Sequence, residues 1–478
     1  MKTTLIFPGI SRLGFNSFAR GNYASTWVSH GLCSISAYAK SKGFEIDLID
    51  LRKCSGWKDF RSEVERRNPD VIGISIMSCD WDIACKCAEF IKKISNSMQI
   101  VAGGIHPTVA LDEVADNKNI DYVITGEGEV SFTDLLGKLE ENVPSERIIQ
   151  GIRPHLDSLP FSDYELFDFE QALKYPFRGK YLKAFDTPFV TIIVARGCPY
   201  KCRFCQPAER LLFGEKVRMR SVDNVIQELR ILREKYRFRS LMIHDDCFTA
   251  YKNWCLEFCA KYKQNGFDQP FIAQSRADII CRNEALVAKL ADVGLKSVII
   301  GFESGSQRVL DFLNKGVKVE QNFEASRICR KYGISVVGNF MLGIPTETNE
   351  EAQQTVDMIK RLDVESPGIT YYTPYPGSDL YHYVKDNSLS LIKKSVQYHR
   401  GRKDAKIRGV DYSFLNKLVY EVFEEPSRFY KILYRPTVNR VFKSRIVQSI
   451  LEGAKGFVVW RFIKKSFRLN LRRGYRLR

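Results

Sequence analysis

Short apolar runs alternate with helix-like stretches along most of the 478-residue chain, in two successive series. This alternation is typical of α/β folds, in which crossover helices connect the strands of a parallel sheet. In the first series the predicted strands are residues 4–7, 45–51, 71–76, 99–102 and 122–125. Five strands with intervening helices predict a doubly wound, flavodoxin-like domain, whose ligands bind beyond the carboxyl ends of the strands.

The second series predicts six more strands, at residues 191–195, 240–244, 270–274, 297–302, 335–342 and 368–373. Helical patterns separate them, and one of these helices is predicted to begin after Ser306 as its N-cap and to end at Gly316. Six such units close only part of the circle that eight strands complete. The sequence therefore predicts a partial (β/α)6 barrel with its site at the carboxyl ends of the strands.

These patterns divide the chain into four parts. We expect a flavodoxin-like domain at residues 1–145, a linker at 146–185, the partial barrel at 186–385 and a helical, basic C-terminal region at 386–478. From Leu391 onward the chain has 23 Lys and Arg against 6 Asp and Glu, which leaves 50 residues of each sign before it. The part of the chain from Leu391 onward thus carries the whole formal net charge of +17.

The cysteines are expected to be free thiols. No apolar run approaches the ~18 residues that span a bilayer, and the apolar start of the chain before Pro8 is too short for a signal peptide. We therefore expect a cytosolic protein. In that reducing compartment, the thirteen cysteines serve metal binding or plain burial rather than a disulfide framework.

Three cysteines follow the first predicted barrel strand, in the segment Arg-Gly-Cys-Pro-Tyr-Lys-Cys-Arg-Phe-Cys at residues 196–205. Thiolates of Cys198, Cys202 and Cys205 at this spacing can bind three corners of a four-iron, four-sulfur cubane, which leaves one iron open. Structural zinc requires four ligands, often in paired C-x2-C units, and the segment offers neither. The alternative is that these cysteines are simply buried. Their position on a Gly/Pro loop at the end of a strand disfavours this alternative.

This segment resembles the C-x3-C-x-aromatic-C signature of the radical S-adenosylmethionine superfamily, with Phe204 as the aromatic residue. The resemblance implies that the open iron chelates the amino and carboxylate groups of S-adenosylmethionine. It implies further that an electron from the reduced cluster breaks the sulfur to C5′ bond, and that the 5′-deoxyadenosyl radical abstracts a substrate hydrogen. A reductant such as flavodoxin or ferredoxin is implied as the partner.

The resemblance also assigns contacts with S-adenosylmethionine to later strand ends. Asp245 or Asp246 is placed near its amino group, and Arg276 near a carboxylate, through a forked hydrogen bond. Glu303, with Ser304 beside it, is placed near the ammonium or ribose, and the strand that contains Asn339 behind the adenine. A charged residue that ends a strand is equally expected as a solvated or salt-bridged group, so both interpretations stay open.

Two further strings, Gly-Gly-Ile-His-Pro-Thr at residues 103–108 and Thr-Gly-Glu-Gly-Glu at 125–129, resemble the radical enzymes that carry a cobalamin-binding domain. The likeness extends over about residues 1–385. It places cobalamin at strand ends where missing side chains let the backbone approach a ligand, at Ser75, Gly103, Gly104, Thr125 and Gly126.

His30 lacks the Asp-x-His-x-x-Gly context that supplies an axial histidine to cobalt in cobalamin domains generally. We therefore expect His30 to be an ordinary residue and cobalamin to be held without an axial histidine. A domain that binds no cofactor is the alternative, because any doubly wound fold needs glycines for the turns at its strand ends.

The predicted function is cobalamin-dependent methylation of an unactivated carbon in a small or lipid-like molecule. Without functional cobalamin, the same radical would drive ring formation, oxidation or rearrangement. RNA modification is a third hypothesis, prompted by the basic tail. Methylthiotransferases of the superfamily carry a second cysteine trio, which the cysteines of residues 33–87 do not form convincingly, and a nucleic acid partner is not expected.

Basic and aromatic side chains interleave along residues 428–478. Such segments can lie on anionic membrane surfaces with their aromatic rings at the headgroup boundary, which predicts peripheral contact with the inner face of the membrane. The alternative is a helical cap whose aromatic rings pack on the barrel, because long cationic side chains commonly cover apolar surface.

Overall fold

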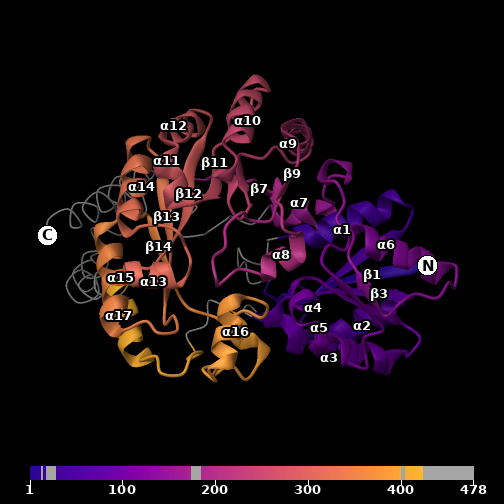
Figure 1. Cartoon of the computed structure of the whole chain (residues 1–478). Coiled ribbons are helices and arrows are strands. Elements are labelled where there is room, and N and C mark those ends of the chain that lie inside the picture. Colours follow the sequence, from indigo (N-terminus) through magenta and orange to yellow (C-terminus); the bar gives the residue numbers. More distant parts are fainter. Residues whose placement is uncertain (12–13, 18–27, 174–184, 400–403, 424–478) are drawn as a thin grey trace, which may run out of the picture. The chain divides into compact units, whose positions relative to one another are not determined.

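The computed structural model describes residues 1–11, 14–17, 28–173, 185–399 and 404–423 (Figure 1). The chain divides into two compact units, Met1–Leu415 and Asn416–Arg478. The first unit contains two six-stranded parallel sheets. The basic segment 428–478 lies outside the described residues.

The first sheet has the strand order β2-β1-β3-β4-β5-β6. Its strands are β1 (Lys2–Phe7), β2 (Glu45–Asp50), β3 (Val71–Ser75), β4 (Gln99–Gly103), β5 (Tyr122–Thr125) and β6 (Ile148–Gln150). The first five are the predicted strands, and their order is that of the flavodoxin-like fold. The edge strand β6 was not predicted, because it has only three residues, two of them exposed, and so shows no apolar run.

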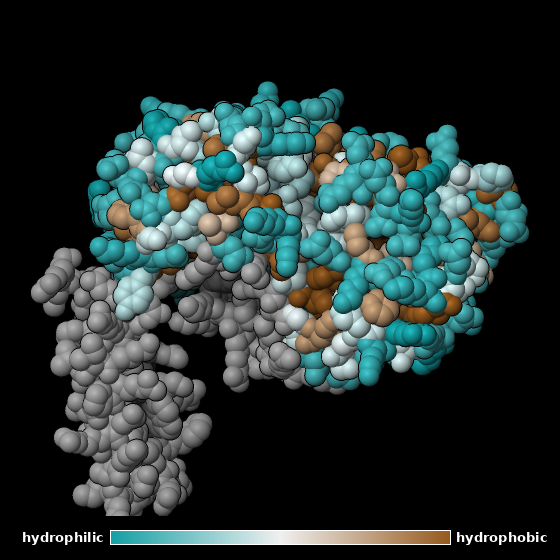
Figure 2. All heavy atoms as spheres, turned by 90° about the horizontal axis from the view of Figure 1, so that it is seen from below, coloured by the Kyte–Doolittle hydropathy of each residue, from teal (hydrophilic) through white to brown (hydrophobic). Residues whose placement is uncertain are grey.

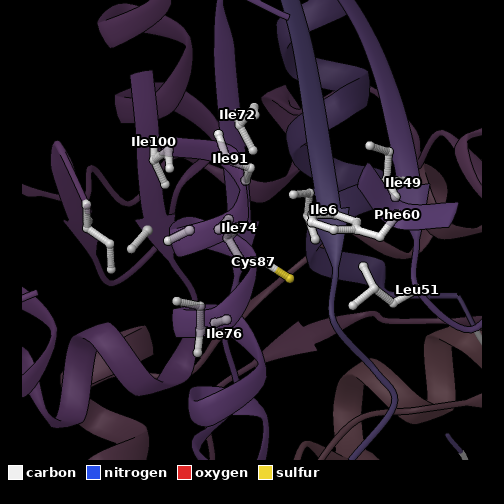
Figure 3. Close-up of a cluster of buried hydrophobic side chains, with 14 of the residues drawn as sticks. Ile6, Ile49, Leu51, Phe60, Ile72, Ile74, Ile76, Cys87, Ile91 and Ile100 are labelled. Carbon is white, nitrogen blue, oxygen red and sulfur yellow. The ribbon is translucent and has the colours of Figure 1, made fainter. Parts of the chain in front are cut away.

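Alternate strand residues point to opposite faces of the sheet, and helices cover both faces. On one face, β3 residues such as Ile72 and Ile74 pack against α2 (Trp57–Arg67) and α3 (Trp81–Ile94). Figure 3 shows this cluster, in which isoleucines of neighbouring strands meet Phe60 of α2 and Cys87 of α3. The other face packs against α1 (His30–Ser41) and α6 (Glu129–Glu140).

The second sheet has its strands in sequential order, β7-β10-β11-β12-β13-β14. They are β7 (Phe189–Ile192), β10 (Ser240–Ile243), β11 (Phe271–Ser275), β12 (Leu295–Glu303), β13 (Ser335–Leu342) and β14 (Ser366–Tyr371). Helices follow these strands, among them α9 (Val222–Tyr236), α10 (Lys252–Gln264), α14 (Val319–Lys331) and α15 (Asn349–Arg361). Sequential parallel strands with crossover helices confirm the predicted partial barrel.

Two predicted ends in the barrel are wrong by three residues or more. The first strand ends at Ile192 rather than at Ala195, because Ala195 and Arg196 form the short strand β8, which pairs antiparallel with β9 (Arg218–Met219). The helix predicted from Ser306 to Gly316 does begin at Ser306, whose hydroxyl accepts a hydrogen bond from the Val309 amide at 3.3 Å. This helix, α13 (Gln307–Phe312), ends early because the chain turns through left-handed Asn314 (φ 49°).

Polar contacts connect the first sheet's domain with the barrel inside unit Met1–Leu415. Tyr164, in the linker, donates a hydrogen bond to the Thr191 carbonyl of β7 at 2.8 Å. At the other end of the barrel, the Asp82 amide of α3 donates to the Ser395 hydroxyl at 3.0 Å, and the Ser395 amide donates to the Asp82 carboxylate at 2.9 Å. The carboxyl ends of both sheets are thereby held around a common space.

Figure 2 shows hydrophilic side chains over much of one face of the molecule, with hydrophobic side chains in small groups. Large hydrophobic residues that are exposed include Met77, Ile105 and Leu211, which follow strand ends or lie on α8 (Ala208–Phe213). Among the described helices, none has both the length and the apolar character needed to cross a membrane.

Candidate functional site

A cavity of about 500 Å³ lies between the carboxyl ends of the two sheets. From the first domain, Ser75, Gly103, Gly104 and Gly126 line it. From the barrel side it is lined by residues that follow the first two strands: Ile193, Val194, Ala195, Arg196, His244 and Asp246. Flavodoxin-like folds and barrels both bind ligands at the carboxyl ends of their strands, and here the two sets of strand ends meet in one cavity.

Bare backbone forms part of the cavity wall. Gly104 has φ 102°, and a Cβ there would lie 2.9 Å from the Ile76 amide nitrogen, so the position requires glycine. A Cβ on Gly103 would meet only the Ile124 carbonyl oxygen, at 3.9 Å, which leaves open space beyond it. Thr125, which was also predicted to bind cobalamin, does not line the described cavity, and its hydroxyl donates to Gln150 Oε1 of β6 at 3.2 Å.

One end of the cavity is an apolar slot between the first sheet and helices α1 and α6. Its walls include Leu5, Val101 and Ile124 from the strands, with Ile35 and Phe132 from the two helices. A flat aromatic group such as the benzimidazole tail of cobalamin fits a slot of this chemistry, since burial of apolar surface favours its entry.

His30 lies at the start of α1 and lines the same cavity. Its Nε2 lies 2.9 Å from the Thr191 hydroxyl of β7. Burial, with smaller contributions from His244 and Arg220, lowers the pKa of His30 to about 3, so the imidazole is neutral. One of its two ring nitrogens is therefore engaged with the barrel, and the expectation that His30 does not ligate cobalt stays a prediction.

The three cysteines of the predicted cluster lie on the loop between β8 and α8. Gly197 turns the chain with φ 98°, and the Cys205 amide donates to the Cys202 carbonyl at 3.0 Å. Burial raises the pKa of Cys198 to about 12 and that of Cys205 well above its ordinary value. Both thiols are therefore protonated in the protein alone, and a metal must displace their protons on binding.

This donor set fits an iron–sulfur cluster. Among the described residues, no three His, Cys, Asp or Glu side chains converge as ligands of a single metal ion. A cubane requires no such convergence, because each thiolate ligates a different iron. Cys198, Cys202 and Cys205 therefore offer what a cluster needs without resembling a mononuclear site.

The guanidinium of Arg276 lies beside Cys202. Arg276 Nη1 is 3.6 Å from the Cys202 Sγ, and its guanidinium stacks 3.6 Å from the Tyr200 ring centroid. Arg276 Nη2 donates to the Lys315 carbonyl at 2.5 Å, and its Nε donates to Asp278 at 2.9 Å. The Arg276 fork that the sequence placed on a cosubstrate carboxylate is thus partly occupied by groups of the protein itself.

Lys315 connects three of the predicted residues. Its Nζ donates to Glu303 Oε1 at 2.8 Å and lies 5.6 Å from the Phe204 ring centroid. Burial alone would lower the pKa of Lys315, but Glu303 and Cys202 raise it above its ordinary value, so the side chain is charged. Positive charge at this position offsets the negative charge of a thiolate-bound cluster.

Glu303 and Asn339 share a face of the barrel with bare backbone. Asn339 of β13 is in register with Gly301 of β12 and Gly368 of β14. A Cβ on Gly301 would lie 2.2 Å from Glu303 Oε1, and one on Gly368 would lie 2.9 Å from Asn339 Oδ1. The side chains of Glu303 and Asn339 thus fill the space that a side chain at Gly301 or Gly368 would need, and their contact with S-adenosylmethionine stays a prediction.

The remaining predicted residues have other surroundings. Asp245 is buried, and its Oδ1 accepts hydrogen bonds from the Val194 and Ala195 amides at 2.8 and 3.2 Å. Ser304 lies 3.1 Å from the Thr355 hydroxyl of α15. Both residues hold neighbouring elements in place, whereas Asp246 lines the cavity. Their assignment to S-adenosylmethionine stays a prediction.

The sequence interpretation missed Lys315, because the predicted helix ran through its position. It also left Glu127 and Glu129 without a role, although both lie in the string that it singled out. The structure pairs them with Arg196, two residues before Cys198. Two sequence signals could have predicted this pairing. They are the acidic pair directly after a strand end and the arginine beside the cysteine motif.

Two protein-family models match the chain. The model of the radical SAM superfamily matches residues 192–359, which include the cysteine loop, and that of the B12 binding domain matches residues 17–136. The chain is a radical S-adenosylmethionine enzyme with a B12-binding domain. The family predicted from the cysteine spacing and the glycine strings is thereby confirmed. Its cofactors are a four-iron, four-sulfur cluster, S-adenosylmethionine and cobalamin, and it needs a reductant.

Named relatives have similar sequences. An uncharacterized methyltransferase of Pyrococcus horikoshii is 28% identical over 460 residues, which cover 92% of this chain and 93% of the relative. The anaerobic magnesium-protoporphyrin IX monomethyl ester cyclase of Rubrivivax gelatinosus is 24% identical over 387 residues, covering 77% and 67%.

A solved structure has the same fold. The radical S-adenosylmethionine methyltransferase TsrM of Kitasatospora setae, with cobalamin and a [4Fe-4S] cluster bound, matches with a TM-score of 0.61 at 17% identity. The match covers 80% of this chain and 74% of TsrM. This likeness confirms the predicted combination of a flavodoxin-like domain and a partial barrel.

Proposed function

We propose that this enzyme methylates an unactivated carbon of a small molecule with the help of cobalamin. The observation that carries the proposal is the single cavity between the two sheets, which has bare glycines on the B12-binding side and Asp246 and Arg196 on the barrel side. A substrate held there would face both cofactors at once. The methyltransferase names of the Pyrococcus horikoshii relative and of TsrM support the same reaction.

When bound, the cluster with S-adenosylmethionine supplies a carbon-centred radical that abstracts hydrogen, and cobalamin supplies the methyl group. The residues of the chain bind and orient these groups. Cys198, Cys202 and Cys205 would hold the cluster, while Glu303 and Asn339, on the neighbouring strands β12 and β13, would contact the nucleoside. Such fixed positions can accelerate a reaction between two bound groups by several orders of magnitude.

Cobalamin would occupy the cavity with its tail in the apolar slot. Gly103, Gly104 and Gly126 would then face the ligand through their backbone, with Ser75 beside them. The apolar walls exclude water, which protects a reactive carbon radical from side reactions.

Ring formation is the second candidate function, favoured by the relative in Rubrivivax gelatinosus that is named as a cyclase. A cyclase and a methyltransferase would share the cluster, the S-adenosylmethionine and the fold. They differ in the fate of S-adenosylmethionine, because only methylation converts part of it to S-adenosylhomocysteine.

The test uses the full chain, reconstituted anaerobically with iron and sulfide and treated with a strong reductant. S-adenosylhomocysteine and 5′-deoxyadenosine are quantified with and without hydroxocobalamin. The proposal predicts S-adenosylhomocysteine that depends on hydroxocobalamin. Formation of 5′-deoxyadenosine alone, at the same rate with and without hydroxocobalamin, would contradict methylation and favour the second candidate.

For residues 428–478 we propose contact with the anionic inner face of the membrane, consistent with a lipid-like substrate. Their interleaved basic and aromatic residues support this proposal. Flotation with liposomes of anionic and of neutral lipid tests it, using the full chain and a variant that ends at residue 427. The proposal predicts flotation of the full chain on anionic liposomes only, and equal flotation of the truncated variant would refute it.

A further inference from the structure

Two buried carboxylates lie at the edge of the B12-binding cavity. Glu127 and Glu129 follow β5 and are 5% and 3% exposed. Both line the cavity together with Gly126. Burial of an unpaired carboxylate costs several kcal/mol, so the partners of these two groups show what the loop is built to hold.

The charged partners come from the barrel side of the cavity. Arg196 Nη1 pairs with Glu127 Oε2, and Arg196 Nη2 donates to Glu129 Oε1 at 2.5 Å. Arg218 pairs with the other oxygen of Glu127, and the Ser34 hydroxyl donates to Glu129 Oε1 at 2.7 Å. Although burial opposes ionisation, Arg196 and Ser34 hold the pKa of Glu129 below its ordinary value. The two carboxylates and two guanidiniums therefore form a closed ionic network.

Both arginines belong to one small element. Arg196 of β8 and Arg218 of β9 are paired in register, so the network fixes the β8–β9 ladder as a unit. Only Gly197 separates Arg196 from Cys198, the first cysteine of the cluster loop. The wall of the B12-binding cavity at Gly126 is thus joined to the cluster loop through one pair of carboxylates and one arginine.

We propose that Glu127 and Glu129 position the cluster loop through Arg196, so that filling the B12-binding cavity changes the reactivity of the iron–sulfur cluster. This inference rests on the proposed function, because it requires both cofactors. The glutamates and Arg196 are positioning residues. They are not assigned a contact with a reacting atom.

A purely structural ion pair would stabilise the fold without coupling the two cofactors. The structure offers a matched control in Asp121, which lies directly before β5, at the opposite end of the same strand. Asp121 accepts hydrogen bonds from Lys92 and from the Ile100 amide, both at 2.7 Å. Loss of its charge disturbs a comparable network of the same domain, away from the described cavity.

The experiment compares the wild-type chain with Glu129→Gln, Arg196→Lys and the control Asp121→Asn. Lysine keeps the positive charge of Arg196 but has no fork that reaches two carboxylates, so the second variant tests the network even if the first does not fold. Iron content, hydroxocobalamin binding and the rate of 5′-deoxyadenosine formation from S-adenosylmethionine are measured, the rate with and without hydroxocobalamin.

In the wild type and in Asp121→Asn, we expect hydroxocobalamin to raise the rate by about ten-fold, the usual size of coupling between two binding sites. In Glu129→Gln and Arg196→Lys, the ratio of the two rates falls to about one, while iron and hydroxocobalamin still bind. A ratio in Arg196→Lys equal to that of the wild type overturns the inference, as does a wild-type ratio of one when the wild type still forms S-adenosylhomocysteine that depends on hydroxocobalamin. A wild type that binds no hydroxocobalamin or forms no 5′-deoxyadenosine instead refutes the proposed function.

Discussion

Filling the open space at Gly103 should block cobalamin without harming the fold. Gly103 ends β4 at the cavity, and a Cβ there meets nothing closer than the Ile124 carbonyl oxygen at 3.9 Å. Its φ lies outside the left-handed region, so a β-branched residue suits this strand position. We therefore expect Gly103→Val to change the free energy of unfolding by less than about 1 kcal/mol, with stabilisation the expected direction.

The same side chain would occupy space that the ligand needs. Forcing extra methyl groups into a filled site costs about 1–3 kcal/mol, which corresponds to a loss of roughly 5- to 150-fold in affinity. The assay titrates hydroxocobalamin into apoprotein and follows the shift of its visible absorption bands, alongside a thermal unfolding curve of each apoprotein. Gly137→Ala serves as the control, because a Cβ there also meets nothing within 4 Å and the residue lies in α6, outside the described cavity.

The binding titration and the unfolding curve test different parts of this prediction. A folded Gly103→Val that binds hydroxocobalamin as tightly as the wild type would refute the placement of cobalamin in this cavity. A variant that unfolds while Gly137→Ala stays folded would refute the claim that the space beyond Gly103 is open.

Three further outcomes are expected. Lys315→Met leaves the buried Glu303 carboxylate unpaired and should lower the free energy of unfolding in urea by about 3–5 kcal/mol, and a loss below about 1 kcal/mol would contradict the pair's burial. Burial raises the pKa of Glu347 to about 8, so the native state binds an extra proton between the ordinary carboxyl pKa and this value. Stability should therefore fall as pH rises through that window, by about 1.4 kcal/mol per pH unit, and Glu347→Gln should flatten the dependence in thermal unfolding. Cys247→Ala should retain the iron that Cys198→Ala loses, and equal loss in iron analysis would show that Cys247 belongs to the ligand set.

Local periodicity is sufficient to predict much of the fold. Isoleucines at alternate positions of β3 face α2 and α3, and apolar runs of this kind identify eleven of the strands from the amino-acid sequence. The strand β6 was not predicted because it is a short, exposed edge strand. The predicted ends of β7 and α13 are wrong because the β8–β9 pairing and the left-handed turn at Asn314 depend on contacts that a linear pattern does not encode.

The site is predictable only where a motif is local in sequence. The three cysteines lie within eight residues of one another and can be identified from their spacing alone. Lys315 pairs with Glu303 across the helix α13, and Glu129 pairs with Arg196 across 67 residues, so their pairing follows from tertiary structure. Ser304 and Asp245 were predicted to contact S-adenosylmethionine because they follow strand ends. In the structure they form hydrogen bonds with neighbouring parts of the chain, a role that the sequence pattern does not distinguish from ligand binding.

The most direct measurement is the iron content and 5′-deoxyadenosine yield of the anaerobically reconstituted chain, beside a variant in which Cys198, Cys202 and Cys205 are all alanine. We predict a four-iron cluster and reductive cleavage of S-adenosylmethionine in the wild type, and neither in the variant. Equal cleavage by both proteins, or a wild type that holds no iron, would contradict the assignment of this loop as the origin of the radical.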